Sequence, residues 1–190
     1  MTARRLVFLG PPGAGKGTQA RMLAGAQKLA HVATGDMLRD AIAAGTDLGR
    51  LAKGYYDRGE LVPDDVVTRM LADRLQHVDA AEGFILDGFP RTIAQAEALE
   101  RLLKDLGQDL ERVVFFDVPE AELIRRLTER RKIEGRADDT DDAIRNRLRI
   151  YAAQTAPLLD HYRSRSLLLS LPGIGTVEAI ADALRRALSR

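Results

Sequence analysis

The chain of 190 residues contains no cysteine. Disulfide bonds, thiolate zinc sites and a cysteine nucleophile are therefore excluded, and the absence suits an intracellular protein. An excess of one charge is missing as well, because 29 lysines and arginines face 28 aspartates and glutamates, which gives a formal net charge of +1. This balance indicates neither a nucleic acid nor a membrane surface as a partner, so any positive charge that matters is expected to be local.

Long apolar runs are also missing. The first apolar run starts at Leu6, directly after MTARR, which leaves no room for the apolar core of a signal peptide. No apolar stretch is long enough to cross a bilayer, and no repeat, low-complexity tract or flexible linker divides the sequence. We therefore expect a cytoplasmic protein with a single domain over residues 1–190.

Short apolar runs predict the strands of a buried sheet, because they are too short for buried helices. The runs lie at 5–10, 83–87, 112–118 and 166–171, with one further short strand at 31–33. Longer stretches between them, such as 94–103, space apolar residues three and four apart, which is typical of one helical face. Strands without polar alternation that alternate with helices indicate an α/β fold, with a parallel sheet of about five strands and helices on both faces.

Two stretches are predicted to be peripheral to this sheet. Residues 34–77 have a helical pattern interrupted by glycines and Pro63, which predicts several short helices joined by turns. Residues 132–138 are polar and predict a connection between two helices. Both stretches are expected to move relative to the sheet.

The segment GPPGAGKGTQ, residues 10–19, follows the first predicted strand and opens a helix. Backbone N–H groups at Gly13, Gly15 and Gly17 are free to wrap a chain of phosphates, and the helix N-terminus adds its positive dipole end. Lys16 supplies a full charge where the β- and γ-phosphates would lie. An ordinary glycine-rich turn is the alternative, but a strand–loop–helix context is the one that a phosphate loop requires. We therefore predict a sheet of the P-loop NTPase type.

The loop departs from the usual pattern at one position. A Ser or Thr normally follows the lysine and holds Mg²⁺, whereas here Gly17 follows it and the hydroxyl is delayed to Thr18. An acidic residue at the end of a neighbouring strand is expected for the metal, and spacing alone does not choose between Asp87 and Asp117. Asp87 is favoured because a turn ending in Arg91 follows it at the carboxyl end of a strand, where ligands bind in parallel sheets. Asp117 is interpreted as a cap or turn residue.

Four segments resemble, in the same order, the signatures of the adenylate kinases: residues 10–19, 34–39 (TGDMLR), 87–91 (DGFPR) and 135–139 (GRADD). The resemblance implies reversible transfer of the γ-phosphoryl group of MgATP to AMP, giving two ADP. It also implies that glycine after the loop lysine is usual, with Mg²⁺ held mainly by phosphates and by waters anchored on groups such as Asp87. The AMP phosphate is largely dianionic at pH 7, since its second pKa is about 6. No general base is therefore needed, and we find no candidate for one.

The resemblance further assigns roles to individual residues. Residues expected to bind ATP are Gly13, Ala14, Gly15, Lys16, Gly17, Thr18, Arg126 and Gly175. Residues expected to bind AMP are Thr34, Arg39, Leu61, Val62, Gly88, Arg91, Gln95, Arg136 and Arg147. Residues expected to act in the transfer itself are Lys16, Arg91, Arg130, Arg136 and Arg147. Arginine suits these roles because its planar, permanently charged group matches phosphate oxygens.

By the same resemblance the chain divides into a CORE, an NMP-binding region and a lid. The CORE comprises 1–33, 63–131 and 139–190, the NMP-binding region is 34–62, and the lid is 132–138. Longer relatives insert a lid domain, sometimes with a four-cysteine zinc site, so this short lid predicts no zinc. The two smaller regions are expected to close over the nucleotides and expel water. A monomer is expected, with ATP, AMP and ADP as its partners.

Several of these residues also have a plainer interpretation. The charged run 125–132, taken alone, predicts a solvated helix face paired with neighbouring glutamates, and the lack of interleaved aromatics disfavours a nucleic-acid patch. Thr34 could serve only as an N-cap, and Gln95 alone is typical of a surface helix. The remaining candidates are isolated from acidic clusters and are interpreted as structural or exposed: His31, His77 and His161.

Two other functions stay open at this point. A kinase for UMP, CMP or another nucleoside monophosphate would share the loop and the arginines, although Thr34 and Gln95 resemble the adenylate kinases. A nucleotide-binding switch that signals without turnover usually carries an Asn-Lys-x-Asp motif, which this sequence lacks. The dense arginines around a second anion site also favour an acceptor substrate over a switch.

Overall fold

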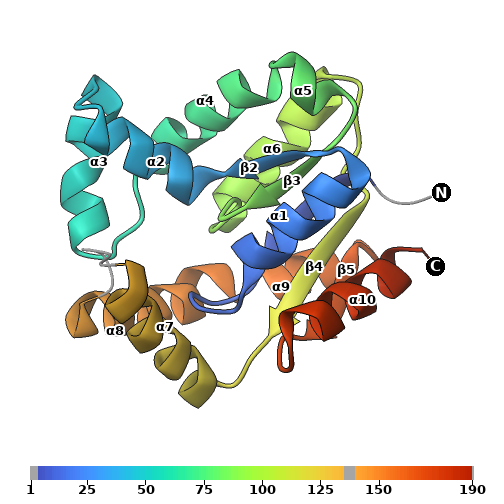
Figure 1. Ribbon diagram of the computed structural model, residues 1–190. Helices are drawn as coiled ribbons and strands as arrows, with labels where there is room; N and C mark the ends of the chain where they lie inside the picture. Colours follow the sequence, from blue (N-terminus) through green and yellow to red (C-terminus); the bar gives the residue numbers. More distant parts are fainter. Residues whose placement is uncertain (1–3, 135–139, 190) are drawn as a thin grey trace.

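The computed structural model describes residues 4–134 and 140–189. Five strands form one sheet in the order β2-β3-β1-β4-β5, and every neighbouring pair runs parallel (Figure 1). The strands are β1 (Arg5–Leu9), β2 (Ala30–Ala33), β3 (Phe84–Asp87), β4 (Arg112–Asp117) and β5 (Leu168–Pro172). The predicted α/β fold is confirmed, and so is the short strand expected at 31–33.

Helices cover the sheet on both faces. The helices of the described residues are α1 (Lys16–Gln27), α2 (Thr34–Ala43), α3 (Asp47–Asp57), α4 (Asp64–Leu75), α5 (Val78–Ala81), α6 (Ile93–Asp105), α7 (Glu120–Glu134), α8 (Asp141–Ile150), the π-helix η2 (Tyr151–Thr155), α9 (Leu158–Arg163) and α10 (Val177–Leu188). Helices α3, α6, α8 and α10 each follow a threonine whose hydroxyl accepts the N–H three residues further on, at 3.0–3.2 Å. Such a cap contributes about 1 kcal/mol. No helix in the described part of the chain is long and apolar enough to span a membrane.

The peripheral stretches are partly as predicted. The glycine-broken stretch forms three short helices, α2, α3 and α4, as expected. The connection predicted at 132–138 is wrong for its first residues, because α7 continues to Glu134. Arg131 and Lys132 have good helix propensity and suit the negative end of a helix, so their polarity did not mark a helix end. Residues 135–138 lie outside the described residues.

The hydrophobic core forms one layer on each face of the sheet. Along β1, Val7 and Leu9 pack into the layer that contains α4, α6 and α9. Leu6 and Phe8 pack into the opposite layer with α1 and α10. The strand is therefore buried on both faces, which explains its continuous apolar run. The loop that leaves its carboxyl end starts from a firmly packed base.

The carboxyl ends of the strands bring distant segments together. Phe8 of β1 pairs with Asp87 of β3, so Asp87 lies beside the loop that follows β1. Helices α2 and α3 lie on one side of this edge, and α7 and α8 lie on the other (Figure 1). The two sides touch where Asn146 of α8 donates from Nδ2 to the carbonyl oxygen of Arg58, at 2.7 Å.

Candidate active site

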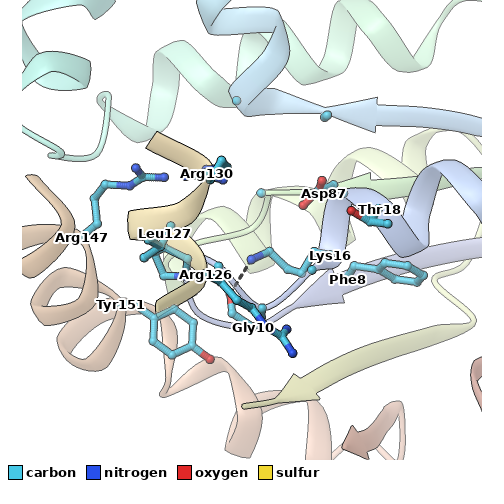
Figure 2. A pocket seen from close by; sticks show the side chains of 18 of the residues that line it. Phe8, Gly10, Lys16, Thr18, Asp87, Arg126, Leu127, Arg130, Arg147 and Tyr151 are labelled. Atoms are coloured by element: carbon cyan, nitrogen blue, oxygen red, sulfur yellow. Dashed lines mark hydrogen bonds between the residues drawn. The ribbon is translucent and has the colours of Figure 1, made fainter. Parts of the chain in front are cut away.

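The loop between β1 and α1 curls around the ammonium group of Lys16. The Ala14 N–H donates to the Pro11 carbonyl at 3.1 Å, which closes a turn within the loop. Gly15 precedes the helix with a φ of 86°, a left-handed conformation that glycine adopts without steric cost. Lys16 Nζ donates to the carbonyl oxygens of Gly10 at 2.7 Å and Pro11 at 3.0 Å, and Figure 2 shows the first of these bonds.

Lys16 lies in a site that is already rich in positive charge. Burial lowers the pKa of Lys16 from its ordinary 10.5 to about 8. Asp87 opposes this shift, whereas Arg91, Arg147 and Arg130 lower the pKa further. A bound anion would favour the charged form again, because opposite charges raise the pKa of an amine. The arrangement therefore suits a polyanionic ligand.

Asp87, at the end of β3, faces the first turn of α1. A Cβ built on Gly17 would lie 3.1 Å from Asp87 Oδ2, so the carboxylate and the helix backbone approach closely. Burial raises the pKa of Asp87, but the nearby His31, Lys16 and Arg91 outweigh burial and leave that pKa below its usual value. The carboxylate is therefore ionised at neutral pH.

His31 and His161 each lie close to a single carboxylate, a contact that the sequence does not predict. His31 Nε2 lies 3.5 Å from Asp87 Oδ2, and both side chains are only 16% exposed. The pairing of β2 with β3 creates this contact, and nothing in the local sequence around His31 marks it. His161 Nε2 lies 2.9 Å from Glu100 Oε1. His77 is exposed, as expected.

A cavity of about 880 Å³ is lined by the loops that follow β1 and β3 and by helices from both sides. The predicted site residues that line it are Gly13, Ala14, Gly15, Lys16, Gly17, Thr18, Arg39, Leu61, Asp87, Gly88, Arg91, Arg126, Arg130 and Arg147. Figure 2 shows Lys16 with Asp87 and Thr18 toward one end of the view and Arg130 and Arg147 toward the other. Residues from widely separated segments thus surround one space.

Two of the arginines that line this cavity, Arg39 and Arg91, are held by specific partners. Arg39 of α2 donates from Nη1 to the hydroxyl of Tyr56 at 2.7 Å. Arg91 donates from Nε to the carbonyl oxygen of Gly88 at 2.8 Å. Burial, followed by the nearby Arg147, lowers the pKa of Arg91. Because the protein's own carboxylates do not fully compensate this buried cation, the position favours an anionic ligand.

The charged run of α7 divides into a solvent-facing part and a cavity-facing part. Arg125 forms ion pairs with Glu122 and Glu129, both at 2.8 Å, as the plainer interpretation predicts. Arg125, followed by Arg126, lowers the pKa of Glu122 to about 2. Arg126 also lines the cavity and donates from Nη2 to the carbonyl oxygen of Gly173 at 3.0 Å. The same run therefore carries both a solvated face and a face toward the cavity.

A second cavity, of about 40 Å³, shares part of its lining with the first. Its lining includes Thr34, Leu61, Val62, Gly88, Arg91 and Gln95. The N-cap interpretation of Thr34 is wrong, because Ala33 holds that position and Thr34 is the first residue of α2. Its hydroxyl donates to the Asp87 carbonyl at 3.4 Å. The surface interpretation of Gln95 is also wrong, since this residue is only 2% exposed.

Of the other residues considered from the sequence, Gly175 and Asp117 line neither of the two cavities. Arg136 lies outside the described residues. Gly175 is exposed in the turn between β5 and α10. Asp117 has an exposed side chain, but its interpretation as a cap or turn residue is wrong. It is the last residue of β4, it pairs with Pro172 of β5, and its carbonyl accepts the Gly173 N–H at 2.7 Å.

Sequence reasoning missed several residues of the site. Tyr56 lines the second cavity, and Tyr151 and Thr155 line the first. Burial raises the pKa of Tyr151 to about 12, and Thr155 donates from Oγ1 to the carbonyl oxygen of Arg91 at 2.8 Å. One usable signal existed, because Tyr151 lies four residues after Arg147 and so shares its helical face. The other two are recruited by contacts between distant segments.

The phosphate loop, the parallel sheet and the cation-lined cavity define a P-loop nucleotide-binding protein. The family model for adenylate kinase matches residues 8–167. The chain is 50% identical over 184 residues to an adenylate kinase of Stenotrophomonas maltophilia, covering 97% of this chain and 98% of the relative. It is 48% identical over 184 residues to one of Thermobifida fusca, covering 97% of each, and 47% identical over 185 residues to one of Leptospira biflexa, covering 97% and 100%. The chain belongs to the adenylate kinase family.

Proposed function

We propose that the protein catalyses reversible transfer of the γ-phosphoryl group of MgATP to AMP, giving two ADP. The observation that carries this proposal is the convergence of Lys16 with arginines from four separate segments on one cavity, which adjoins a second cavity lined by Thr34 and Gln95. Two converging polyanions are the ligands that such a charge distribution would neutralise. Membership of the adenylate kinase family supports the same reaction.

The donor nucleotide would bind at the loop between β1 and α1. The N–H groups around Gly13, Gly15 and Gly17 would wrap the phosphates, with Ala14 and Thr18 beside them, and Lys16 would exchange its two loop carbonyl partners for phosphate oxygens. Arg126 would contact ATP from α7. Gly175 would contribute from the turn before α10, next to Val177, which lines the larger cavity.

The acceptor nucleotide would bind between α2 and the turn that follows β3. Arg39 and Arg91 would hold the AMP phosphate. The base would enter the second cavity, where the lining residues proposed to contact or shape its site are Thr34, Leu61, Val62, Gly88 and Gln95. Tyr56 supports this arrangement because it binds the Arg39 guanidinium at 2.7 Å.

Catalysis in this scheme is positioning and charge neutralisation. The phosphate of AMP is already largely dianionic at pH 7, its second pKa being about 6, so no side chain has to remove a proton. Fixed cations would stabilise the charge that develops during transfer. The residues proposed for this task are Lys16, Arg91, Arg130, Arg136 and Arg147. Closure of the NMP-binding region (34–62) and the lid (132–138) over the CORE would exclude water, a competing acceptor.

The residues near Lys16 fit a Mg²⁺ ion that keeps most of its water ligands. Asp87 is an ionised, partly buried carboxylate beside the loop. Within residues 4–134 and 140–189, no group of three or more His, Cys, Asp or Glu side chains forms a metal site, so a cage built of protein alone is not the arrangement here. Magnesium is characteristically bound by one or two carboxylates, waters and substrate phosphates. When bound, Mg²⁺ would neutralise charge on the β- and γ-phosphates, and Asp87 would orient it through water.

We further propose that the protein works as a cytoplasmic monomer. Large exposed apolar side chains of the described residues, such as Leu51, Val78 and Ile133, lie on separate helices. This scattered arrangement disfavours a hydrophobic interface between protomers. Sedimentation of the purified protein at several concentrations tests the oligomeric state.

Phosphorus NMR tests the proposed reaction directly. The purified protein is mixed with MgATP and, in separate tubes, with AMP, UMP, CMP, GMP or no acceptor. We expect rapid formation of ADP with AMP and little hydrolysis without an acceptor. Faster turnover with another monophosphate would assign the protein to a different acceptor, and slow hydrolysis that ignores the acceptor would overturn the proposal.

A further inference from the structure

The carboxylate of Asp64, the first residue of α4, is bound at both of its oxygens. Oδ1 accepts from the Nε2 of Gln95 at 2.6 Å. Oδ2 accepts from the hydroxyl of Thr92 at 2.9 Å. The same hydroxyl accepts the backbone N–H of Gln95 at 3.1 Å, so Thr92 links the two residues a second time. An acidic side chain also suits the first turn of a helix. Asp64 is therefore held firmly against Gln95.

The amide of Gln95 has only one satisfied orientation in this setting. Its Oε1 accepts the backbone N–H of Arg91 at 2.7 Å, while its Nε2 donates to Asp64. A backbone N–H can only donate and a carboxylate can only accept. Rotating the amide by half a turn would therefore place N–H against N–H and oxygen against oxygen. Because Gln95 is only 2% exposed, water could not compensate the lost bonds.

The locked amide still has capacity for a ligand. A primary amide offers two N–H donors and two oxygen lone pairs. The bonds to Asp64 and Arg91 use one of each, so one donor and one acceptor are left, in a fixed order. Gln95 lines the second cavity. A 6-aminopurine presents an acceptor at N1 beside a donor at N6, whereas a 6-oxopurine presents the reverse order. A fixed amide can match only one of the two patterns.

We propose that Asp64 is a positioning residue that makes the second cavity select a 6-aminopurine over a 6-oxopurine, by fixing the orientation of the Gln95 amide. The proposal rests on the proposed function, because it requires that this cavity receives the acceptor base. Asp64 itself does not touch the base in this scheme. Its contribution is to prevent the amide from turning to match the wrong pattern.

The experiment compares AMP with inosine monophosphate, since these acceptors differ only in the 6-substituent and the proton at N1. The measured quantity is the ratio of kcat/KM for the two acceptors with MgATP. Asp64→Ala removes the acceptor for Gln95 Nε2, and we expect it to lower the ratio roughly tenfold, the effect of one buried hydrogen bond. Asp64→Asn keeps an oxygen for Nε2 and should preserve the ratio. Asp65→Ala is the matched control, because the Asp65 side chain is 73% exposed and forms an ion pair with Arg69 on the same helix, at 3.2 Å.

Each outcome decides the proposal. A merely structural role for Asp64 would lower kcat/KM for both acceptors equally, so an unchanged ratio in active Asp64→Ala would overturn the proposal. An Asp64→Asn enzyme that discriminates as poorly as Asp64→Ala would also overturn it, because the charge rather than the acceptor geometry would then matter. A wild-type protein that does not phosphorylate AMP would overturn the proposed function and this inference together.

A second readout covers the case in which the Asp64→Ala variant does not fold. In the wild-type protein, the side-chain amide hydrogens of Gln95 should exchange with solvent at least roughly tenfold more slowly than those of the exposed Gln76. NMR of the two side-chain amides measures this difference. Equal exchange rates would show that the Gln95 amide is not locked, and the proposal would fall.

Discussion

Gly17 and Asp87 lie in contact across the space between α1 and β3. A Cβ on Gly17 would be 3.1 Å from Asp87 Oδ2, closer than most Cβ contacts in proteins. This relationship explains the absence of a side chain directly after the loop lysine. The carboxylate occupies the space that a serine or threonine would need, and the hydroxyl comes one residue later, at Thr18.

Alanine at Gly17 should therefore disturb the site, although alanine normally favours helices. Gly25 is the matched control, because it lies in the same helix and nothing lies within 4 Å of its added Cβ. We expect Gly25→Ala to stabilise the protein by up to about 1 kcal/mol. Gly17→Ala should show less gain or a net loss, and should lower kcat/KM roughly tenfold through the displaced carboxylate. Thermal unfolding measures the stability of both variants, and steady-state kinetics measures their kcat/KM. Equal changes in the two variants would contradict the importance of the contact between Gly17 and Asp87.

Nucleotide binding above pH 8 should take up a proton at Lys16. With a pKa of about 8, Lys16 is mostly neutral at pH 8.5 in the free protein. Phosphates would restore its charge, so ATP binding should take up roughly 0.7 of a proton at that pH. Calorimetry in buffers of different ionisation enthalpy measures the uptake. Lys16→Arg is permanently charged and should lose it; the same uptake in that variant would assign the proton to another group.

In the free protein, the lowered pKa of Lys16 should make its contribution to the free energy of unfolding increase with pH. Its pKa is lower in the folded state than the ordinary 10.5, so the unfolded chain binds more protons between about pH 8 and pH 10.5. Within this window Lys16 contributes a free energy of unfolding that rises with pH. Denaturant titrations at pH 8 and pH 10 measure the free energy of unfolding of wild type and Lys16→Met. Between these two pH values the free energy of unfolding should rise more, or fall less, in wild type than in Lys16→Met. Parallel pH profiles for the two proteins would contradict it.

The turn around Gly59 should tolerate alanine much less than the turn around Gly45. Both glycines have left-handed φ values, +67° and +64°, so alanine is strained at each, by about 1–2 kcal/mol. Only Gly59 packs against α8, where an added Cβ would lie 2.9 Å from the Ala143 carbonyl and from Arg147 Cγ. Gly59→Ala should therefore cost about 1–3 kcal/mol more than Gly45→Ala. Gly59→Ala should also lower kcat, whereas Gly45→Ala should not. Equal losses of stability and of kcat in the two variants would exclude a role for the contact between Gly59 and α8.

Removal of the Tyr56 hydroxyl should weaken the proposed acceptor site. Arg39 Nη1 donates to this hydroxyl at 2.7 Å, and Tyr56→Phe keeps the ring while deleting the bond. We expect KM for AMP to rise roughly three- to tenfold, the usual effect of one hydrogen bond, with KM for MgATP unchanged. Tyr55→Phe is the control from the neighbouring position. An equal rise for both nucleotides would indicate a general loss of structure.

The sequence by itself determined the elements that depend on local pattern. The central strands β1, β3 and β4 were predictable because strands buried on both faces are continuous apolar runs, whereas a polar residue interrupts the apolar pattern of each edge strand, β2 and β5. The phosphate loop was predictable because its glycines and lysine lie close together in the chain. Arg126 and Arg130 are four residues apart, and this spacing by itself puts them on one face of α7. Helix boundaries were less certain: Thr34 proved to be the first helical residue, and α7 extended to Glu134. Polar residues form helices as readily as loops, so composition alone did not mark these ends.

Only the tertiary structure decided which distant residues meet. The pairing of β2 with β3 places His31 against Asp87, and the start of α4 brings Asp64 to Gln95. The burial of Gln95 also depends on this packing, and its position in α6 does not predict it from the sequence. These contacts join residues far apart in the chain, and their energy depends on burial, charge and hydrogen-bond partners that arise only after the layers have packed. The local pattern therefore supplied the phosphate loop, and packing supplied the surroundings that set its charges and its proposed selectivity.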